Sequence, residues 1–247
     1  MRIPVTVVLL CCAVGFPATA GDDQAKALVE KTIKAVGGAE KLGKFASFTA
    51  RSEGKMFGPD FDYVEENSSV LPEKYRFSIE LSNQMAKLKQ VMVFNGPKAW
   101  TKIENLKAIA LPKEAAAAFQ DYFYALRLVM VPVGLKEKDM TLSLVGEVNV
   151  GDRPAIGLSV TCKGKRDVTI YYDKETSLPV KMELNALDTI SEKEVQHEFL
   201  FSQHKELEGV RFPLEMVWNK DGKKFMTREF KELRPAEKLD AGLFAEP

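Results

Sequence analysis

The part of the chain after Lys138 is a succession of short segments in which apolar and polar residues alternate, with turn residues between them about every ten positions. Such alternation is the pattern of a β-strand that buries one face and leaves the other in water. The strands predicted on this basis span 140–145, 148–150, 155–162, 168–173, 180–184, 194–201, 214–219 and 225–230. Because no strand–helix–strand unit with a glycine fingerprint interrupts them, they predict one antiparallel meander and not a parallel sheet.

The clearest hairpin in this meander is the segment YYDKETSLPVKM at Tyr171–Met182. Two alternating runs flank a polar corner, where Asp173 and Ser177 can bond to their own backbone in a loop of about four or five residues. Pro179 suits the start of the second strand, where no ladder donor is lost. The segment predicts a hairpin that is wet on one face and apolar on the other.

The first half of the chain combines strands with two helices. The amphipathic pattern of residues 22–42 predicts a helix that stops at two glycines and a further short turn. Strand-like alternation follows from Phe45 to Leu81 and again from Lys89 to Ile103, where Asn-Gly marks a turn. The alanine- and aromatic-rich segment Pro112–Leu128 predicts a second helix with a wide apolar stripe.

Residues 1–20 have the features of a secretory signal peptide: one cation at Arg2, an uncharged apolar run, and small residues at positions 18 and 20. A membrane anchor would need about 20 apolar residues and a stop-transfer flank. Lipid attachment at Cys11 or Cys12 is a second alternative, but Leu10 and Cys11 stand where a small residue is preferred. We therefore expect cleavage near Ala20 and a mature protein of one domain, residues 21–247.

The charge and cysteine content of this mature chain exclude two classes of protein. Loss of the leader removes only Arg2 from the charged set, which leaves 34 basic and 35 acidic residues and a formal charge of −1. No nucleic-acid partner is expected at that balance. Cys162 is the one cysteine left, so the chain cannot form an internal disulfide and must depend on its core.

No motif predicts catalysis, a metal or a cofactor. His197 and His204 lie on one predicted strand with opposite parity, so that they should face opposite sides of the sheet, and no metal site is expected. A nucleophile elbow, a P-loop and a cysteine–histidine pair are absent from the sequence, and the run Glu65-Glu66 is interpreted as a solvated face. We expect a protein that is not an enzyme.

Large, soft apolar side chains are the one type in excess on the predicted strands and on the second helix. Aromatic and methionine residues are more often ordinary core than ligand contacts. An open, curved sheet of about ten strands, however, cannot fill its concave face with its own side chains, and two helices leave room for a cavity. The candidate cavity residues are Phe61, Tyr63, Met92, Phe94, Trp100, Phe119, Phe123, Met182, Phe199, Phe201, Met216 and Trp218.

Several motifs along the mature chain resemble those of a known family. They are AVGGAEKL, LPEKYRFSI, VFNGPKAW, VGDRPAIGLSV, YYDKETSLPVKME, EGVRFPLEM and LDAGLFAEP. Together they resemble the bacterial outer-membrane lipoprotein-sorting proteins related to the LolA and LolB carriers. The resemblance implies an α+β fold in which an unclosed antiparallel β-barrel, expected here to have about ten or eleven strands, is covered by two or more helices around a hydrophobic cavity for acyl chains.

The resemblance also implies a function and a compartment. We expect a monomeric periplasmic protein that carries a lipid or an acylated protein, exchanges it with an envelope protein partner, and performs no covalent chemistry. The helix at Pro112–Leu128 is expected to act as a lid. The alternative is a structural or interaction module of the envelope whose concave face is filled and whose sheet edge pairs with a partner strand.

Overall fold

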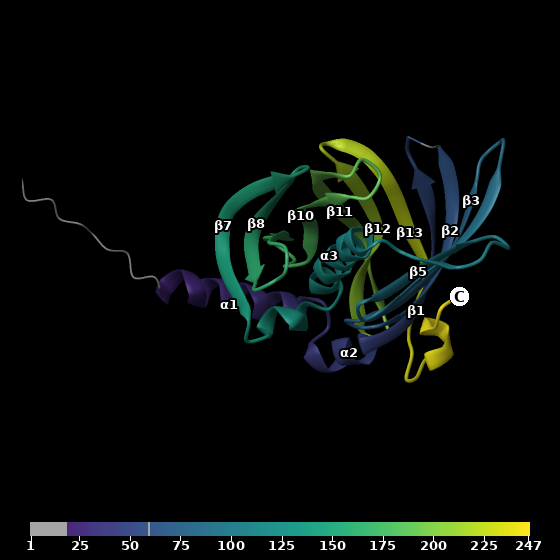
Figure 1. The fold of residues 1–247 in the computed structure, drawn as a ribbon. Helices are drawn as coiled ribbons and strands as arrows, with labels where there is room; N and C mark the ends of the chain where they lie inside the picture. Colours follow the sequence, from purple (N-terminus) through teal and green to yellow (C-terminus); the bar gives the residue numbers. More distant parts are fainter. Residues whose placement is uncertain (1–18, 59) are drawn as a thin grey trace, which may run out of the picture.

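The computed structural model describes residues 19–58 and 60–247, and within them thirteen strands form one antiparallel sheet that does not close on itself (Figure 1). The strands are β1 (Ser47–Met56), β2 (Phe61–Val70), β3 (Lys74–Ser82), β4 (Lys87–Asn95), β5 (Lys98–Ile103), β6 (Ile109–Ala110), β7 (Met140–Val150), β8 (Arg153–Cys162), β9 (Val168–Asp173), β10 (Pro179–Asp188), β11 (Lys193–Leu207), β12 (Val210–Lys220) and β13 (Lys223–Pro235). The helices are α1 (Thr19–Ala35), α2 (Ala39–Gly43) and α3 (Lys113–Met130), with the short 3₁₀ turns η1 (Lys44–Ala46), η2 (Pro132–Lys136) and η3 (Ala241–Phe244).

The sheet consists of two meanders that meet at one seam. Strands β1–β6 and strands β7–β13 each run in sequence order, and β1 pairs with β13 to join them. The outer strands of the whole sheet are then β6 and β7, which are consecutive in the chain. Helix α3 and η2 form the connection between these two edges, and α3 lies within the curve of the sheet (Figure 1). The topology therefore places one amphipathic helix across the concave face.

One end of the concave face is filled by helices. Helix α1 buries Ala25, Val29 and Ile33, and Val36 directly after the helix continues this stripe at helical spacing. This stripe joins residues of α3 and of the inner face of β7–β11 in a single core, which includes Leu128, Leu142, Leu158, Val160, Ile170, Tyr172, Met182, Leu184 and Phe199. Burial of this much apolar surface makes this end of the sheet the main source of stability.

The end of α1 is fixed by Gly37. Its φ of 125° lies in a region that favours glycine, and a Cβ at this position would lie 2.3 Å from the carbonyl oxygen of Gly209. The start of β12 is bonded to the same helix end, because Arg211 donates its backbone N–H to Val36 O at 2.8 Å. The glycine stop predicted from sequence is thus also the point where α1 docks against the β11–β12 turn.

The predicted open antiparallel architecture is confirmed, but the predicted strand number is wrong. The stretch from Phe45 to Leu81, predicted as strand-like without strand bounds, contains β1, β2 and most of β3. Strand β6 has only two residues, too few for an alternation pattern, and residues 140–150 form one strand and not two. The register of β7 shifts between Leu144 and Gly146, which explains why the alternation breaks there. The predicted hairpin is present as β9 and β10, and the second helix is present as α3 with Pro112 as its N-cap residue.

The predicted signal peptide lies largely outside the described residues, which begin at Thr19. In the described part of the chain, no helix combines the length and the hydropathy needed to cross a membrane.

Candidate ligand-binding cavity

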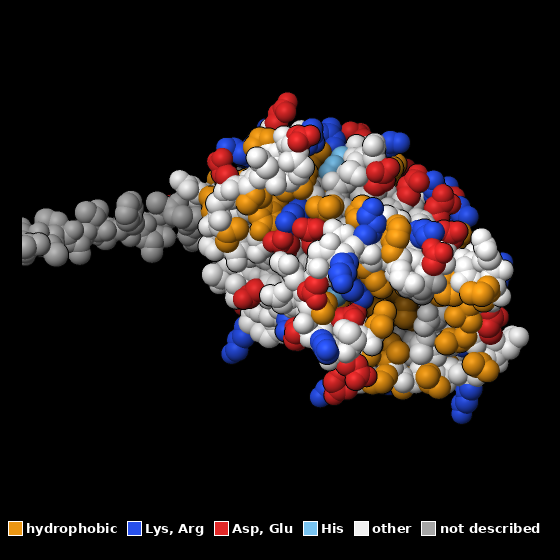
Figure 2. Space-filling model, turned by 90° about the horizontal axis from the view of Figure 1, so that it is seen from above, with side chains coloured by type: hydrophobic (Ala, Val, Ile, Leu, Met, Phe, Trp, Pro, Cys, Tyr) orange, Lys and Arg blue, Asp and Glu red, His pale blue; other side chains and the backbone are white. Residues whose placement is uncertain are grey.

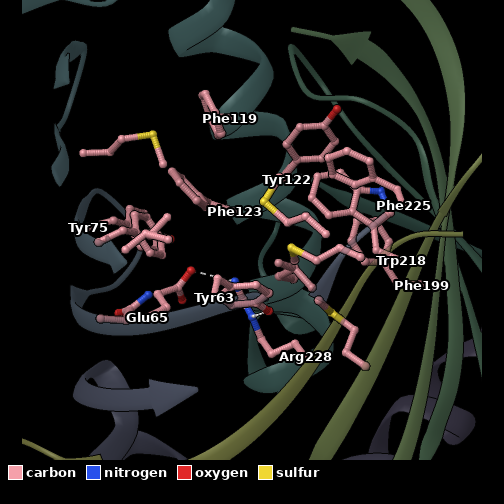
Figure 3. A pocket seen from close by; sticks show the side chains of 18 of the residues that line it. Tyr63, Glu65, Tyr75, Phe119, Tyr122, Phe123, Phe199, Trp218, Phe225 and Arg228 are labelled. Carbon is pink, nitrogen blue, oxygen red and sulfur yellow. Dashed lines mark hydrogen bonds and ion pairs between the residues drawn. The ribbon is translucent and has the colours of Figure 1, made fainter. Parts of the chain in front are cut away.

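A cavity of about 440 Å³ lies between α3 and the part of the sheet that the helices leave uncovered (Figure 3). Its walls come from α3, from β1–β4 and from β11–β13. The apolar side chains that line it are Phe48, Met56, Tyr63, Leu71, Tyr75, Phe77, Ile79, Leu81, Met92, Phe119, Tyr122, Phe123, Leu126, Met130, Ile190, Phe199, Phe201, Pro213, Met216, Trp218, Phe225, Met226 and Phe230.

Helix α3 contributes one face to the main core and another to the cavity. Ala125, Leu128 and Val129 are buried in the core. The cavity side consists of residues 119, 122, 123, 126, 127 and 130, which follow the spacing of three and four that keeps side chains on one face of a helix. The helix is therefore a wall of the cavity that is anchored in the core, and its opening as a rigid lid would expose that core.

Two groups of aromatic rings form the side walls. On β3, β4 and α3, the ring of Phe123 stacks on Tyr75 at 4.2 Å between centroids and on Phe77 at 5.3 Å. On the opposite wall, Trp218 packs 5.1 Å from Phe199 and 4.9 Å from Phe225. Ring pairs at these separations add to the stability gained from area burial.

A buried hydrogen-bonded chain joins α3 to the sheet at the second wall. Trp218 Nε1 donates to His197 Nδ1 at 3.0 Å, the distance from His197 Nε2 to Tyr122 Oη is 2.8 Å, and Tyr122 Oη donates to Leu187 O at 3.0 Å. These partners fit a neutral imidazole that carries its proton on Nε2. Burial, with a further contribution from Lys220, lowers the pKa of His197 to about 4. The histidine thus acts as a structural link between helix and sheet.

A charged pair lies in the third wall. Arg228 on β13 donates through Nη2 to Glu65 Oε2 at 2.8 Å, and Glu65 is only 4% exposed. Arg228 Nε also lies 3.4 Å from Tyr63 Oη, which donates to Thr227 O at 2.9 Å (Figure 3). Burial raises the pKa of Glu65, although Arg228 opposes this effect. Burial also works against the charged guanidinium, but Glu65 and Tyr63 together raise the pKa of Arg228.

Small residues on β1 allow this pair to form. In the sheet, Gly54 is opposite Tyr63 on β2 and opposite Arg228 on β13, so β1 separates the two long side chains. A Cβ at Gly54 would lie 1.9 Å from Thr227 O and 3.0 Å from the Tyr63 ring. Ser52 is likewise opposite Glu65 on β2. Because these β1 positions carry almost no side chain, residues from the flanking strands can meet across the seam.

The cavity reaches solvent at the β10–β11 turn. Ile190 in this turn lines the cavity and is 70% exposed. Beside it, Asp188 accepts from Ser191 and forms an ion pair with Lys220. Burial opposes ionisation of Asp188, but these hydrogen bonds lower its pKa to about 2. Figure 2 shows apolar side chains gathered in a hollow on this face, with charged side chains around them.

Eight of the twelve predicted residues line the cavity, namely Tyr63, Met92, Phe119, Phe123, Phe199, Phe201, Met216 and Trp218. The other four do not, and their prediction as lining residues is corrected. Phe94 packs behind Phe119 and Phe123, and Met182 is fully buried in the helix-filled end. Trp100 pairs with Val93 on the opposite face of the sheet from buried Ala99 and Thr101, and Phe61 is half-buried at the start of β2.

Sequence reasoning missed the polar residues of the cavity. Glu65 is inside and not on a solvated face, because it shares the parity of Tyr63 on β2. Arg228 shares the parity of Met226 and Phe230 on β13, so the alternation of this strand also places Arg228 on the cavity face. Across the described residues, no three His, Cys, Asp or Glu side chains come together in a way that could hold a metal.

The pKa of His197 leads to a prediction for stability. Between pH 6.5 and about 4 the unfolded chain binds a proton at this residue and the folded protein does not, so the free energy of unfolding should fall as the pH is lowered through this window. Thermal unfolding of the wild type and of His197→Gln should reveal this as a smaller pH dependence in the variant. His204→Gln should reduce the pH dependence of stability in the same way, because burial also lowers the pKa of His204 to about 4. An unchanged slope in His197→Gln would contradict the assignment.

The fold and the site define a class of protein: an unclosed antiparallel half-barrel whose helices leave an apolar cavity on the concave face. Two solved structures are similar in fold over 90% of this chain and 97% of their own. They are a LolA superfamily protein from Nitrosomonas europaea (TM-score 0.57, 13% identity) and a putative outer membrane lipoprotein-sorting protein domain from Vibrio parahaemolyticus (TM-score 0.55, 10% identity). A DUF1329 family protein from Desulfovibrio piger is similar over the same shares (0.52, 13%). No family model and no curated protein matches the sequence. The predicted resemblance is thus confirmed as one of fold: the chain has the fold of the LolA superfamily.

Proposed function

We propose that the protein is a non-catalytic, periplasmic carrier that binds the acyl chain of a lipid or lipoprotein in the cavity. The observation that carries this proposal is the hollow itself: helices fill one end of the concave face, while about 440 Å³ with aromatic and methionine walls stays open at the other. This volume lies within the range of about 300–1,000 Å³ found for small-molecule sites. The outer membrane lipoprotein sorting named for the Vibrio protein of the same fold is consistent with such a cargo.

The energetics of an acyl chain support binding without covalent chemistry. Each methylene moved from water into an apolar site contributes about 0.8 kcal/mol. About ten buried methylenes would therefore contribute about 8 kcal/mol before the costs of association, and micromolar affinity corresponds to about the same figure. An apolar cavity of moderate size can thus hold a chain reversibly, as a carrier requires.

The polar groups of the cavity favour binding over catalysis. Ser69 Oγ donates to Asn67 Oδ1 at 2.6 Å, so this hydroxyl has no base as partner, and Glu65 bonds to Arg228. Tyr122 Oη is the lining hydroxyl that contacts a histidine, but His197 carries its proton on the Nε2 that faces it and Tyr122 donates to Leu187 O, so the imidazole is not placed as a base for this hydroxyl. The alternative of an interaction module with a filled concave face is less compatible with the open hollow.

The proposal can be tested with a neutral reporter dye. N-Phenylnaphthylamine should gain fluorescence on binding the protein, and lauric acid or its methyl ester should displace it with saturation near one ligand per chain. The protein must be delipidated first, so that a cavity already occupied does not imitate a lack of affinity. Absence of any saturable binding to the delipidated, folded protein would overturn the proposal.

A further inference from the structure

The charged pair in the cavity wall has hydrogen-bonding capacity that the protein does not use. A guanidinium has five N–H donors and a carboxylate has about four acceptor sites. The direct contact within the pair is the single bond from Arg228 Nη2 to Glu65 Oε2 at 2.8 Å. Within the described residues, Arg228 Nη1 and Glu65 Oε1 have no hydrogen-bond partner in the protein. Both side chains line the cavity, and Glu65 is only 4% exposed. Charged groups so placed gain from an added partner.

The surroundings of the pair supply more donors than acceptors. Asn67 follows Glu65 along the same face of β2 and also lines the cavity. Its Oδ1 accepts from Ser69, which leaves the Asn67 Nδ2 donors without a partner within the described chain. Arg228 Nη1 and Asn67 Nδ2 thus leave four N–H donors in the cavity wall, where Glu65 Oε1 is the carboxylate oxygen of the pair without a partner. A ligand group that accepts hydrogen bonds fits this set best.

We infer that Arg228 and Asn67 form a polar subsite that binds the carbonyl oxygen of an acyl ligand, so that the chain extends from there between the aromatic walls. This inference rests on the proposed function and adds the chemical class of the ligand end. Tyr63 supports the subsite through its contact with Arg228 Nε. Two sources share the chemistry: the carboxylate of a free fatty acid, and the ester or amide carbonyl of an acylated lipid or protein. A carboxylate would lie beside Glu65, whereas an ester or amide carbonyl adds no charge to the site.

The test compares twelve-carbon probes that differ only at one end: dodecane, methyl laurate and lauric acid, each used to displace N-phenylnaphthylamine. The informative variant is Glu65→Leu with Arg228→Met, because replacing both members of a buried pair with apolar residues keeps the fold. The matched control is Glu53→Leu with Lys231→Met. This second pair joins β13 to β1, whereas the cavity pair joins β13 to β2. Its atoms lie 2.9 Å apart, and neither residue lines the cavity.

For the wild type and the control variant we expect methyl laurate to bind at least about tenfold more tightly than dodecane, as one hydrogen bond to a charged group provides. In the Glu65/Arg228 variant the neutral amide of Asn67 is the donor that remains, so this ratio should fall by about fivefold, while dodecane displaces the dye as before. Equal affinities in the wild type, or an unchanged ratio in the variant, would overturn the subsite. Failure of all three probes to displace the dye would instead overturn the proposed function.

Lauric acid separates the two sources within a positive result. If it binds as tightly as the ester at neutral pH, the subsite accepts a free carboxylate. If it matches the ester only in acid, where its own carboxyl group is neutral, the subsite favours ester and amide carbonyls. Both outcomes support the carbonyl subsite, and lauric acid binding that is equal in wild type and variant at every pH contradicts it.

Discussion

The single substitution Arg228→Met is expected to lower the free energy of unfolding by about 3–5 kcal/mol, because it leaves Glu65 buried without its partner. The double variant Glu65→Leu with Arg228→Met should recover most of this loss, since apolar side chains of similar volume suit the surrounding wall. Urea denaturation of the wild type and both variants measures these differences.

The loss in the single variant should also depend on pH. Burial already raises the pKa of Glu65, and removal of Arg228 takes away the group that opposes this effect. The folded variant therefore binds a proton more readily than its unfolded chain, and its deficit relative to the wild type should shrink as the pH falls through the folded pKa. A deficit of less than 1 kcal/mol at neutral pH, or one that does not change with pH, would contradict the buried pair described above.

Leu126→Trp is expected to weaken binding of an acyl probe by about a hundredfold while leaving stability nearly unchanged. Leu126 lines the cavity from α3 and is only half-buried, so a larger ring there occupies space that a ligand would fill. Excluding about four methylenes would cost about 3 kcal/mol of binding. The measurement is the dissociation constant for methyl laurate by dye displacement, together with the thermal midpoint.

Ala117→Trp is the matched control for this variant. Ala117 lies on the exposed face of α3, so the same indole is added to the same helix without entering the cavity. Leu126 is a better test position than Phe123, because Phe123 stacks on Tyr75 and Phe77 and a change there would also damage packing. Equal binding by both tryptophan variants and the wild type would mean that the ligand lies elsewhere.

Local patterns of the sequence were sufficient to predict the hairpins and α3. The β9–β10 hairpin and α3 have clear periodicity and turn chemistry, and both appear where predicted. Strand β1 was harder to recognise because its positions beside the charged pair are Gly54 and Ser52, which give no apolar alternation. The small residues that remove the apolar alternation of β1 are also the ones that let Tyr63 and Arg228 contact each other across this strand.

Parity predicts which face of a strand a side chain is on, but not what covers that face. Met182 and Phe199 both lie on the concave side, yet one is buried in the helix-filled end and the other lines the hollow. The difference depends on where α3 crosses the sheet, which is a long-range property of the connection between β6 and β7. Trp100, in contrast, shares the parity of Lys98 and Lys102, so its place on the opposite face could be predicted from the sequence.

Native mass spectrometry of the mature protein, purified without detergent and measured again after organic extraction, tests the central claim most directly. The account predicts an added mass of one acyl-bearing molecule on a near-stoichiometric fraction of the protein, which extraction releases and identifies. A protein that carries no such mass, and still carries none after incubation with phospholipid vesicles and with lauric acid methyl ester, would contradict it.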